Sequence, residues 1–166
     1  MLRKAIARYC HNGGNLFVSG AYVATDLWDN GTPDPEAQQF ANRVLHYTWR
    51  TGQASTSGRV QPAPSPFARF NHLDLNYWNT LNATCYAAES PDGIEPCGAG
   101  SYTIQRYDDT RIGAGIFYRG DTYSTCVLGY PFETIVSDTE RDALMQAILS
   151  TFDEAAGSDT PSNEPH

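Results

Sequence analysis

The sequence of 166 residues predicts a single three-layer α/β domain, with a sheet between two layers of helices. Residues 5–28 are typical of a helix end, a glycine turn, a short buried strand and the start of another helix. Residues 125–152 show the same order of strand and helix near the other end of the chain. Between them, residues 67–123 alternate strand-like runs with turns, which indicates an inserted antiparallel section.

The first strand decides where a functional site is expected. Apolar residues recur at helical spacing over residues 2–9, and this pattern stops at the Asn-Gly-Gly of residues 12–14. Leu16–Val18 is too short an apolar run for a helix, and we expect a central parallel strand there. A helix is then expected over residues 21–27. Because ligands bind beyond the carboxyl ends of strands in open α/β sheets, residues 19–26 are the first candidates for function.

The remaining elements follow from periodicity and punctuation. Residues 29–35 form a proline- and glycine-rich loop, residues 35–47 one amphipathic helix, and residues 49–65 a long loop or an irregular strand pair. We expect strands at 70–71, 86–88, 102–107, 114–118 and 125–130, and a helix at 139–152. The domain is expected to span residues 1–154, and residues 155–166 to form a disordered tail.

Charge and hydropathy limit the partners. The formal net charge is −8, so no basic cluster is expected that could displace the counterions of a nucleic acid. No apolar run approaches the ~20 residues of a membrane-spanning helix. The first residues lack the apolar core of a signal peptide and begin inside a helix. We therefore expect a part of a longer protein, from which the N-terminal strands of the sheet are missing.

The cysteines and histidines predict neither a metal site nor a bound cofactor. The four cysteines have no metal-ligand spacing, and the histidines are scattered over different elements. Cys85 and Cys97 bracket a short segment and could form a disulfide in an oxidising compartment, although four reduced thiols are the favoured alternative.

Two pieces of the chain resemble class I glutamine amidotransferase-like domains, a flavodoxin-like α/β family. One is the Gly-Gly-x-Leu-x-Val-Ser-Gly of residues 13–20, and the other is the Val-Leu-Gly-Tyr-Pro-Phe-Glu of residues 127–133. The run from Ser90 to Glu133 is also similar to the C-terminal part of large secreted bacterial proteins labelled xanthan lyase, which have golvesin-like or fibronectin-like modules. The resemblance implies a secreted, periplasmic or cell-surface location, with the other domains of the parent protein and polysaccharide as partners.

In active members of this family, the first strand leads into a nucleophile elbow with cysteine, and the closing strand ends in His-Pro-Glu. Here Ser19 lies at the elbow without a cysteine, Pro131 stands where the histidine belongs, and Glu133 keeps the acid. A thiolate needs a neighbouring base in order to form and to be positioned. We therefore expect a non-catalytic, degenerate amidotransferase-like accessory module of a secreted polysaccharide- or cell-wall-processing protein.

A second hypothesis is a hydrolase or lyase that acts on polysaccharide through Ser19 and Glu133, with groups from the loop at 50–65. Since Gly-x-Ser-x-Gly is absent, a small turn residue is the favoured interpretation of Ser19. Glu133 is more simply a capping or solvent-facing residue. Asp26, paired with Asp29 and Glu133 as glycosidase-type carboxylates, is the least favoured alternative.

A third hypothesis is a carbohydrate-binding module with an aromatic platform formed by Trp28, Trp49 and Trp78 together with Tyr47 and Tyr77. Half-buried core aromatics are the favoured alternative for this set. The candidate binding residues at the strand ends are Tyr22, Asp26, Trp28, Trp49 and Arg50.

Overall fold

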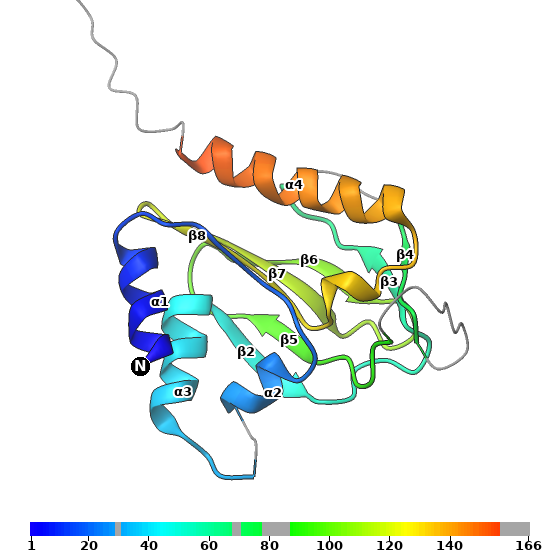
Figure 1. Ribbon diagram of the computed structural model, residues 1–166, viewed down its shortest axis with the longest axis horizontal. Coiled ribbons are helices and arrows are strands. Elements are labelled where there is room, and N and C mark those ends of the chain that lie inside the picture. Colours follow the sequence, from blue (N-terminus) through cyan, green and yellow to red (C-terminus); the bar gives the residue numbers. More distant parts are fainter. Residues whose placement is uncertain (29–30, 68–70, 78–86, 157–166) are drawn as a thin grey trace, which may run out of the picture.

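A computed structural model describes residues 1–28, 31–67, 71–77 and 87–156, and it is a mixed α/β structure (Figure 1). The helices are α1 (Leu2–His11), α2 (Val23–Trp28), α3 (Pro35–Phe40), the π-helix η1 (Ala41–Leu45), the 3₁₀-helix η2 (Phe132–Thr134) and α4 (Asp138–Ala156). The strands are β1 (Leu16–Val18), β2 (Tyr47–Thr51), β3 (Arg59–Pro62), β4 (Leu73–Asp74), β5 (Gly93–Pro96), β6 (Ser101–Tyr107), β7 (Gly113–Arg119) and β8 (Ser124–Leu128). None of the helices in these ranges combines the length and the hydropathy that a membrane span requires.

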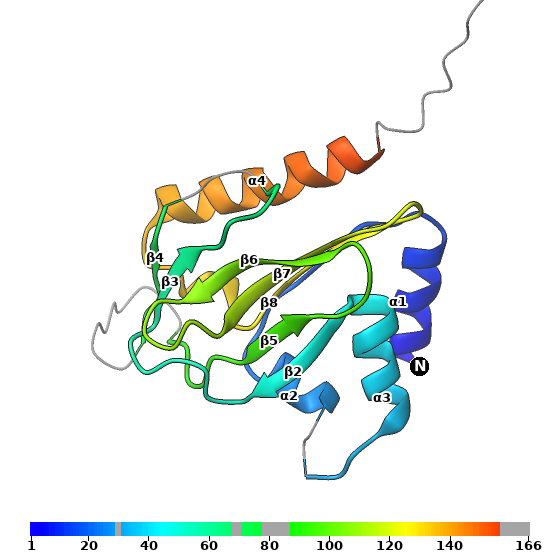
Figure 2. The same cartoon turned by 180° about the vertical axis from the view of Figure 1, so that it is seen from behind.

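The larger sheet is curled and has six strands in the order β1-β8-β7-β6-β3-β4 (Figure 1). Strands β1 and β8 are parallel, with Leu16 opposite Thr125 and Val18 opposite Val127. The other neighbours in this sheet are antiparallel. A separate antiparallel pair, β2–β5, lies beside them (Figure 2). The α/β class and the antiparallel middle section are therefore confirmed.

Strand β1 pairs in parallel as expected, but its predicted central position is wrong. It forms one edge of the six-stranded sheet and pairs with β8 alone among the described strands. Its three residues are only partly buried. A short apolar run is equally compatible with a central strand and with an edge strand that helices cover, because the run does not specify its neighbours.

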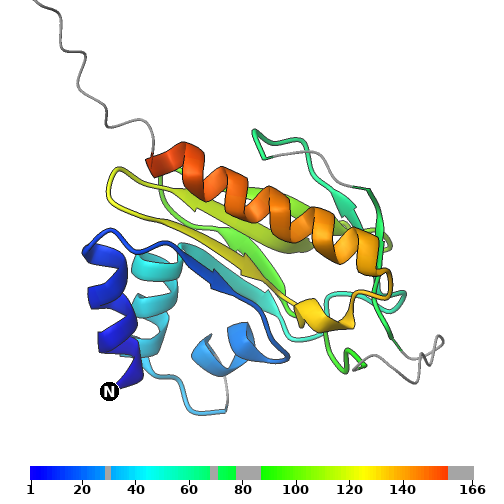
Figure 3. The ribbon, with the colours of Figure 1, turned by 45° about the horizontal axis from the view of Figure 1, so that its top comes forward.

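Helices cover both faces of the sheet, and alternate residues of its strands enter two different cores. Phe117 belongs to the core beneath α4, where Leu144 and Ile148 are fully buried (Figure 3). Ile116 and Val127 belong to the second core, which includes residues of α1, α2, α3 and the β2–β5 pair. Neighbouring residues on a strand point to opposite faces, so the alternation divides β7 and β8 between the two cores.

The single helix predicted over residues 35–47 is wrong in its second half. Asp34 caps α3, because its carboxylate accepts hydrogen bonds from the N–H groups of Glu36 (2.9 Å) and Ala37 (3.2 Å). The helix then widens into η1, and His46 ends it in the left-handed region, with φ at 61°. The next residues form β2, so Trp49 lies in a strand.

The segment at 49–65 contains the end of β2 and all of β3, so it is not only a loop. The alternative of a strand pair is also wrong, because β2 pairs with β5, and β3 pairs with β4 and β6. The structure also contains β5, a strand that the sequence analysis missed. Residue 70 of the strand expected at 70–71 and residue 86 of the one expected at 86–88 lie outside the described residues. Residues 71, 87 and 88 are described and are not in strands, so these two expectations are wrong there. Residues 157–166 also lie outside the described residues, whereas α4 continues to Ala156.

Candidate functional site

The two predicted motifs meet at one edge of the sheet, because β1 and β8 are parallel and their carboxyl ends are adjacent. The N–H of Phe132 donates a hydrogen bond to Oγ of Ser19 (3.3 Å). The rings of Phe17 and Phe132 pack edge to face, with centroids 5.7 Å apart. Glu133 is exposed and lies in η2 directly beyond β8. The structure thus brings Ser19 beside the segment that contains Glu133.

The connection from β1 to α2 is a strand-to-helix turn with one strained residue. Tyr22 has φ at 60°, a left-handed conformation that costs a non-glycine residue roughly 1–2 kcal/mol. A nucleophile elbow places its reactive residue on such a sharp turn between a strand and a helix. Here the strained position belongs to Tyr22, three residues beyond Ser19. Tyr22 is 38% exposed, and its hydroxyl lies 3.5 Å from Oε2 of Glu89.

Asp92 caps helix α2 from a distant part of the chain. It is fully buried, and one carboxylate oxygen accepts hydrogen bonds from the N–H groups of Ala24 (3.0 Å) and Thr25 (3.3 Å). The other oxygen accepts the Thr25 hydroxyl at 2.6 Å. Burial raises the pKa of Asp92, and the hydrogen bonds from Thr25 and Ala24 offset part of this rise. The carboxylate therefore satisfies donors at the positive end of α2.

Sequence reasoning missed Asp92, because a Pro-Asp-Gly segment is typical of a turn. One feature of the sequence indicates that a distant residue caps α2. The positions directly before α2 are Gly20, Ala21 and Tyr22, and none of these has a side chain that caps a helix well, apart from the weak preference for glycine. A helix start without a local cap needs an acceptor from elsewhere in the fold.

The backbone around Asp92 is held in place by the end of β8 and by a buried tyrosine. The Asp92 N–H donates a hydrogen bond to the carbonyl oxygen of Gly129 (2.6 Å). The Tyr107 hydroxyl lies 2.9 Å from the carbonyl oxygen of Asp92 and 3.3 Å from that of Gly129. A Cβ at position 129 would lie 2.2 Å from the Asp92 carbonyl oxygen, so only glycine permits this approach. The position of the carboxylate is therefore fixed by the main sheet.

The candidate aromatic residues divide between the two cores, because Tyr47 belongs to the second core and Tyr77 to the core beneath α4. Trp28 and Trp49 are half-buried and pack against the second core. The Trp49 indole N–H donates to Oγ1 of Thr25 (2.9 Å), which connects β2 to the Asp92 cap. Asp26 is exposed on α2. Trp78 lies outside the described residues.

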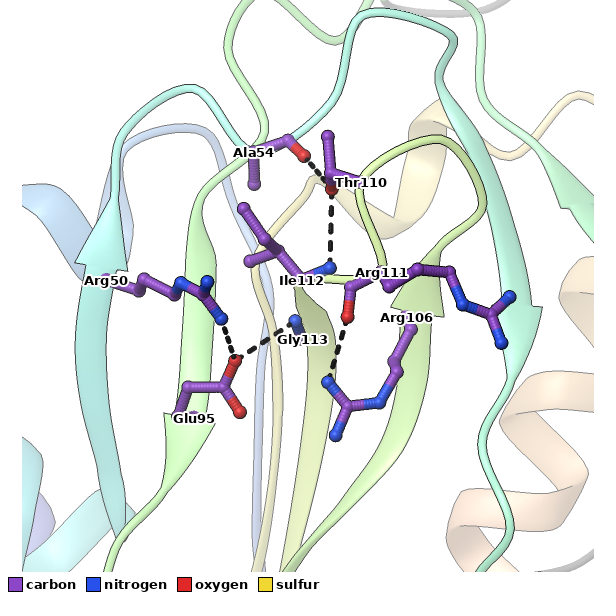
Figure 4. A network of polar contacts seen from close by, with 8 residues as sticks. All are labelled: Arg50, Ala54, Glu95, Arg106, Thr110, Arg111, Ile112 and Gly113. Carbon is purple, nitrogen blue, oxygen red and sulfur yellow. Dashed lines mark hydrogen bonds and ion pairs between the residues drawn. The ribbon is translucent and has the colours of Figure 1, made fainter.

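Arg50 makes its contact across the β2–β5 pair (Figure 4). Its guanidinium forms an ion pair with Glu95 (3.1 Å), and the same glutamate oxygen lies 3.5 Å from the Gly113 N–H. Figure 4 shows Arg106 and Arg111 on the β6–β7 hairpin nearby, where Arg106 donates to the Arg111 carbonyl (2.9 Å). Arg50 is thus held by Glu95, although its side chain remains 56% exposed.

None of the described thiols, nor the partly buried imidazole of His46, forms a hydrogen bond with Ser19 among the described residues. Cys10 and Cys126 are buried, and burial raises the pKa of both thiols. Cys97 has a free thiol, and Cys85 lies outside the described residues. The His46 ring stacks on the ring of Tyr118, and its Nε2 lies 3.0 Å from the Tyr123 hydroxyl. Tyr123 directly precedes β8, so this contact is at the amino end of the strand, whereas Ser19 lies near its carboxyl end. Within the described ranges, no group of three or more metal-ligating side chains is present.

No model of a known protein family matches the chain, and a search of curated proteins finds no match either. The fold and the site define a mixed α/β protein with a sharp strand-to-helix turn at the carboxyl ends of β1 and β8.

Proposed function

We propose that this chain is a non-catalytic, degenerate amidotransferase-like accessory module of a secreted protein that processes polysaccharide or cell wall. The finer flavodoxin-like assignment of the fold is part of the same proposal. The observation that supports it best is the occupant of the strained turn, since Tyr22 stands where an elbow presents its nucleophile.

A phenol is a weak substitute for an activated nucleophile. The unperturbed pKa of tyrosine is about 10, so its hydroxyl is protonated near neutral pH unless a base removes the proton. The nearest described partner of the Tyr22 hydroxyl is the Glu89 carboxylate at 3.5 Å, and carboxylates in general are far weaker bases than phenolates. Tyr22 is better suited to contact a partner surface than to attack a substrate.

Ser19 also lacks the surroundings of a nucleophile. Its oxygen accepts the Phe132 N–H, and within the described chain no histidine forms a hydrogen bond with it. Without a base, an enzyme of this kind retains only the residual rate that binding and oxyanion stabilisation provide. The described residues around Ser19 therefore pack and form hydrogen bonds as structural residues, and they do not form a catalytic triad.

The test combines activity with active-site labelling. The purified chain should show no glutaminase or esterase activity above background, and a fluorophosphonate probe should not label it. Ser19→Ala and Tyr22→Phe serve as matched variants, because each removes a single hydroxyl. Stoichiometric labelling that one of these variants abolishes, with the fold intact by circular dichroism, would refute the proposal.

A further inference from the structure

Helices α1 and α3 lie side by side (Figures 1 and 3). A pocket of about 410 Å³ opens between them. Four basic side chains line it, Arg3, Lys4 and His11 of α1 and Arg43 of η1. The other lining residues used below are Ala7, Glu36, Gln39, Phe40 and Val44. We call this the α1–α3 pocket.

The charge of the α1–α3 pocket is opposite to that of the whole chain. Three permanent cations line it, Arg3, Lys4 and Arg43, against the single carboxylate of Glu36, in a protein with a formal net charge of −8. Arg3 already has a counter-ion, because it forms an ion pair with Asp34 at 2.9 Å. Across the described residues, no acidic side chain lies within ion-pair distance of Lys4 or Arg43. Two cations at the pocket are thus available to an anion.

The floor of the pocket is apolar. Phe40 and Val44 are 8% and 6% exposed and belong to the second core, and Ala7 packs against the same core. Gln39 is exposed and adds an uncharged amide to the lining. An apolar floor with a few convergent polar groups is the usual composition of a small-molecule site.

The wall that contains Arg43 is a π-helix, which is a rare conformation that is frequent at functional sites. The hydroxyl of Tyr123 lies 3.2 Å from the carbonyl oxygens of both Arg43 and Val44. The same hydroxyl contacts Nε2 of His46 at 3.0 Å, directly after η1. Tyr123 is only 7% exposed, so this wide turn is anchored to the core. The backbone that presents Arg43 is therefore held in place before any ligand arrives.

We propose that the α1–α3 pocket binds a small organic anion, with a carboxylate or phosphate group on Lys4 and Arg43 and a compact body over Phe40 and Val44. This pocket is separate from the Ser19–Phe132 contact at the ends of β1 and β8, and the proposal does not depend on the accessory-module proposal. A carboxylate and a phosphate present the same acceptor chemistry to an ammonium and a guanidinium, so the acid group is distinguished by experiment.

The experiment is calorimetric titration of the full 166-residue chain with glucuronate, glucose 6-phosphate and glucose. Glucose has the same ring without an acid group and controls for binding of the body alone. We expect saturable millimolar or tighter binding of at least one anion and none of glucose. The anion that binds more tightly identifies the acid group.

Variants then locate the site. Lys4→Gln and Arg43→Gln should each weaken binding of that anion by about tenfold, because each removes one charge-assisted contact. Arg8→Gln is the matched control, since Arg8 is an exposed cation of α1 that does not line the pocket, and it should change the affinity by less than about twofold. Gln39→Glu places a negative charge in the pocket, removes no cation, and should also weaken binding.

Two results would overturn the proposal. One is the absence of saturable binding of both anions to a chain that is folded by circular dichroism. The other is an equal effect of Arg8→Gln and Arg43→Gln, which would show that net charge, and not the pocket, attracts the anion.

Discussion

Replacing Asp92 with alanine tests whether helix α2 depends on a carboxylate from another part of the chain. The change removes the acceptor of two backbone N–H groups, those of Ala24 and Thr25, and of the Thr25 hydroxyl. The Ala24 contact is buried, and Asp92 itself is fully buried, so water reaches the orphaned groups poorly. The expected effect is therefore larger than the loss of an exposed helix cap.

The magnitude follows from these contacts. Loss of an N-cap acceptor costs about 1 kcal/mol, and each buried donor left without a partner costs about 1–3 kcal/mol. Removal of a desolvated carboxylate returns part of this free energy, because burial raises the pKa of Asp92. We expect Asp92→Ala to lower the free energy of unfolding by about 3 kcal/mol. For a chain of this length, the melting temperature should fall by about 6–12 °C.

Asp92→Asn is the matched control, since it keeps the shape and one oxygen acceptor. It should cost about 1 kcal/mol, because its amide nitrogen replaces one of the two accepting oxygens. The folded pKa of Asp92 is raised above the unfolded value of about 3.9. The stabilisation that the Asp92 carboxyl group contributes to the free energy of unfolding is thus fully present below the unfolded pKa, and it is lost as the pH rises through the folded pKa. The cost of Asp92→Asn should be larger at about pH 4 than at about pH 7.

Urea unfolding followed by far-ultraviolet circular dichroism measures all three proteins at both pH values. A cost of less than about 1 kcal/mol for Asp92→Ala would refute the capping argument, since that is the cost of an exposed cap alone. Equal costs for the alanine and asparagine variants would contradict this division, because they would show that the shape and the single oxygen acceptor that asparagine keeps contribute nothing to stability.

Two further predictions concern Tyr22 and the cysteines. Tyr22→Gly should be about 1 kcal/mol more stable than Tyr22→Ala in urea, because glycine adopts a φ of 60° without Cβ strain; equal stabilities would show that the turn is unstrained. In the native protein, Cys97 should react with a thiol reagent faster than Cys126, because burial closes access to Cys126 and raises its pKa. A Cys97→Ser variant should lose this fast reaction of Cys97, and an unchanged reaction profile in that variant would contradict the assignment.

The sequence was sufficient for most elements with strong periodicity. Strand β6 and helix α4 were predicted within a few residues, because alternation or helical spacing is maintained along them. Strand β7 was predicted as closely, because a short apolar run lies between two turn-like segments. The halves of the helix expected at 35–47 could not be separated, since the spacing of buried residues changes little between an α-turn and a single π-turn. The start of α3 at the Asp34 cap is indicated locally, because proline is common at the first helical position and Pro35 follows Asp34.

The candidate site was predictable only where its residues are local. Ser19 follows a visible strand, but its approach to Phe132 depends on the pairing of β1 with β8, and the sequence analysis named no partner for the first strand. The contribution of Asp92 depends on a contact over 68 positions, which no local pattern encodes. The conformation of Tyr22 was also hidden, because tyrosine is not a residue that normally indicates a left-handed turn.

The pairing of β1 with β8 also sets the order in which the protein can fold. Asn15 and Ser124, which are 109 positions apart, are joined by a hydrogen bond of 2.8 Å beside this pair. During synthesis, the turn with Ser19 and Tyr22 leaves the ribosome early but has no strand to pair with until β8 follows. At about 5–20 residues per second, that delay is on the order of 5–20 s. Such non-local pairing slows folding, so this edge of the sheet is among the last parts of the nascent chain to acquire its structure.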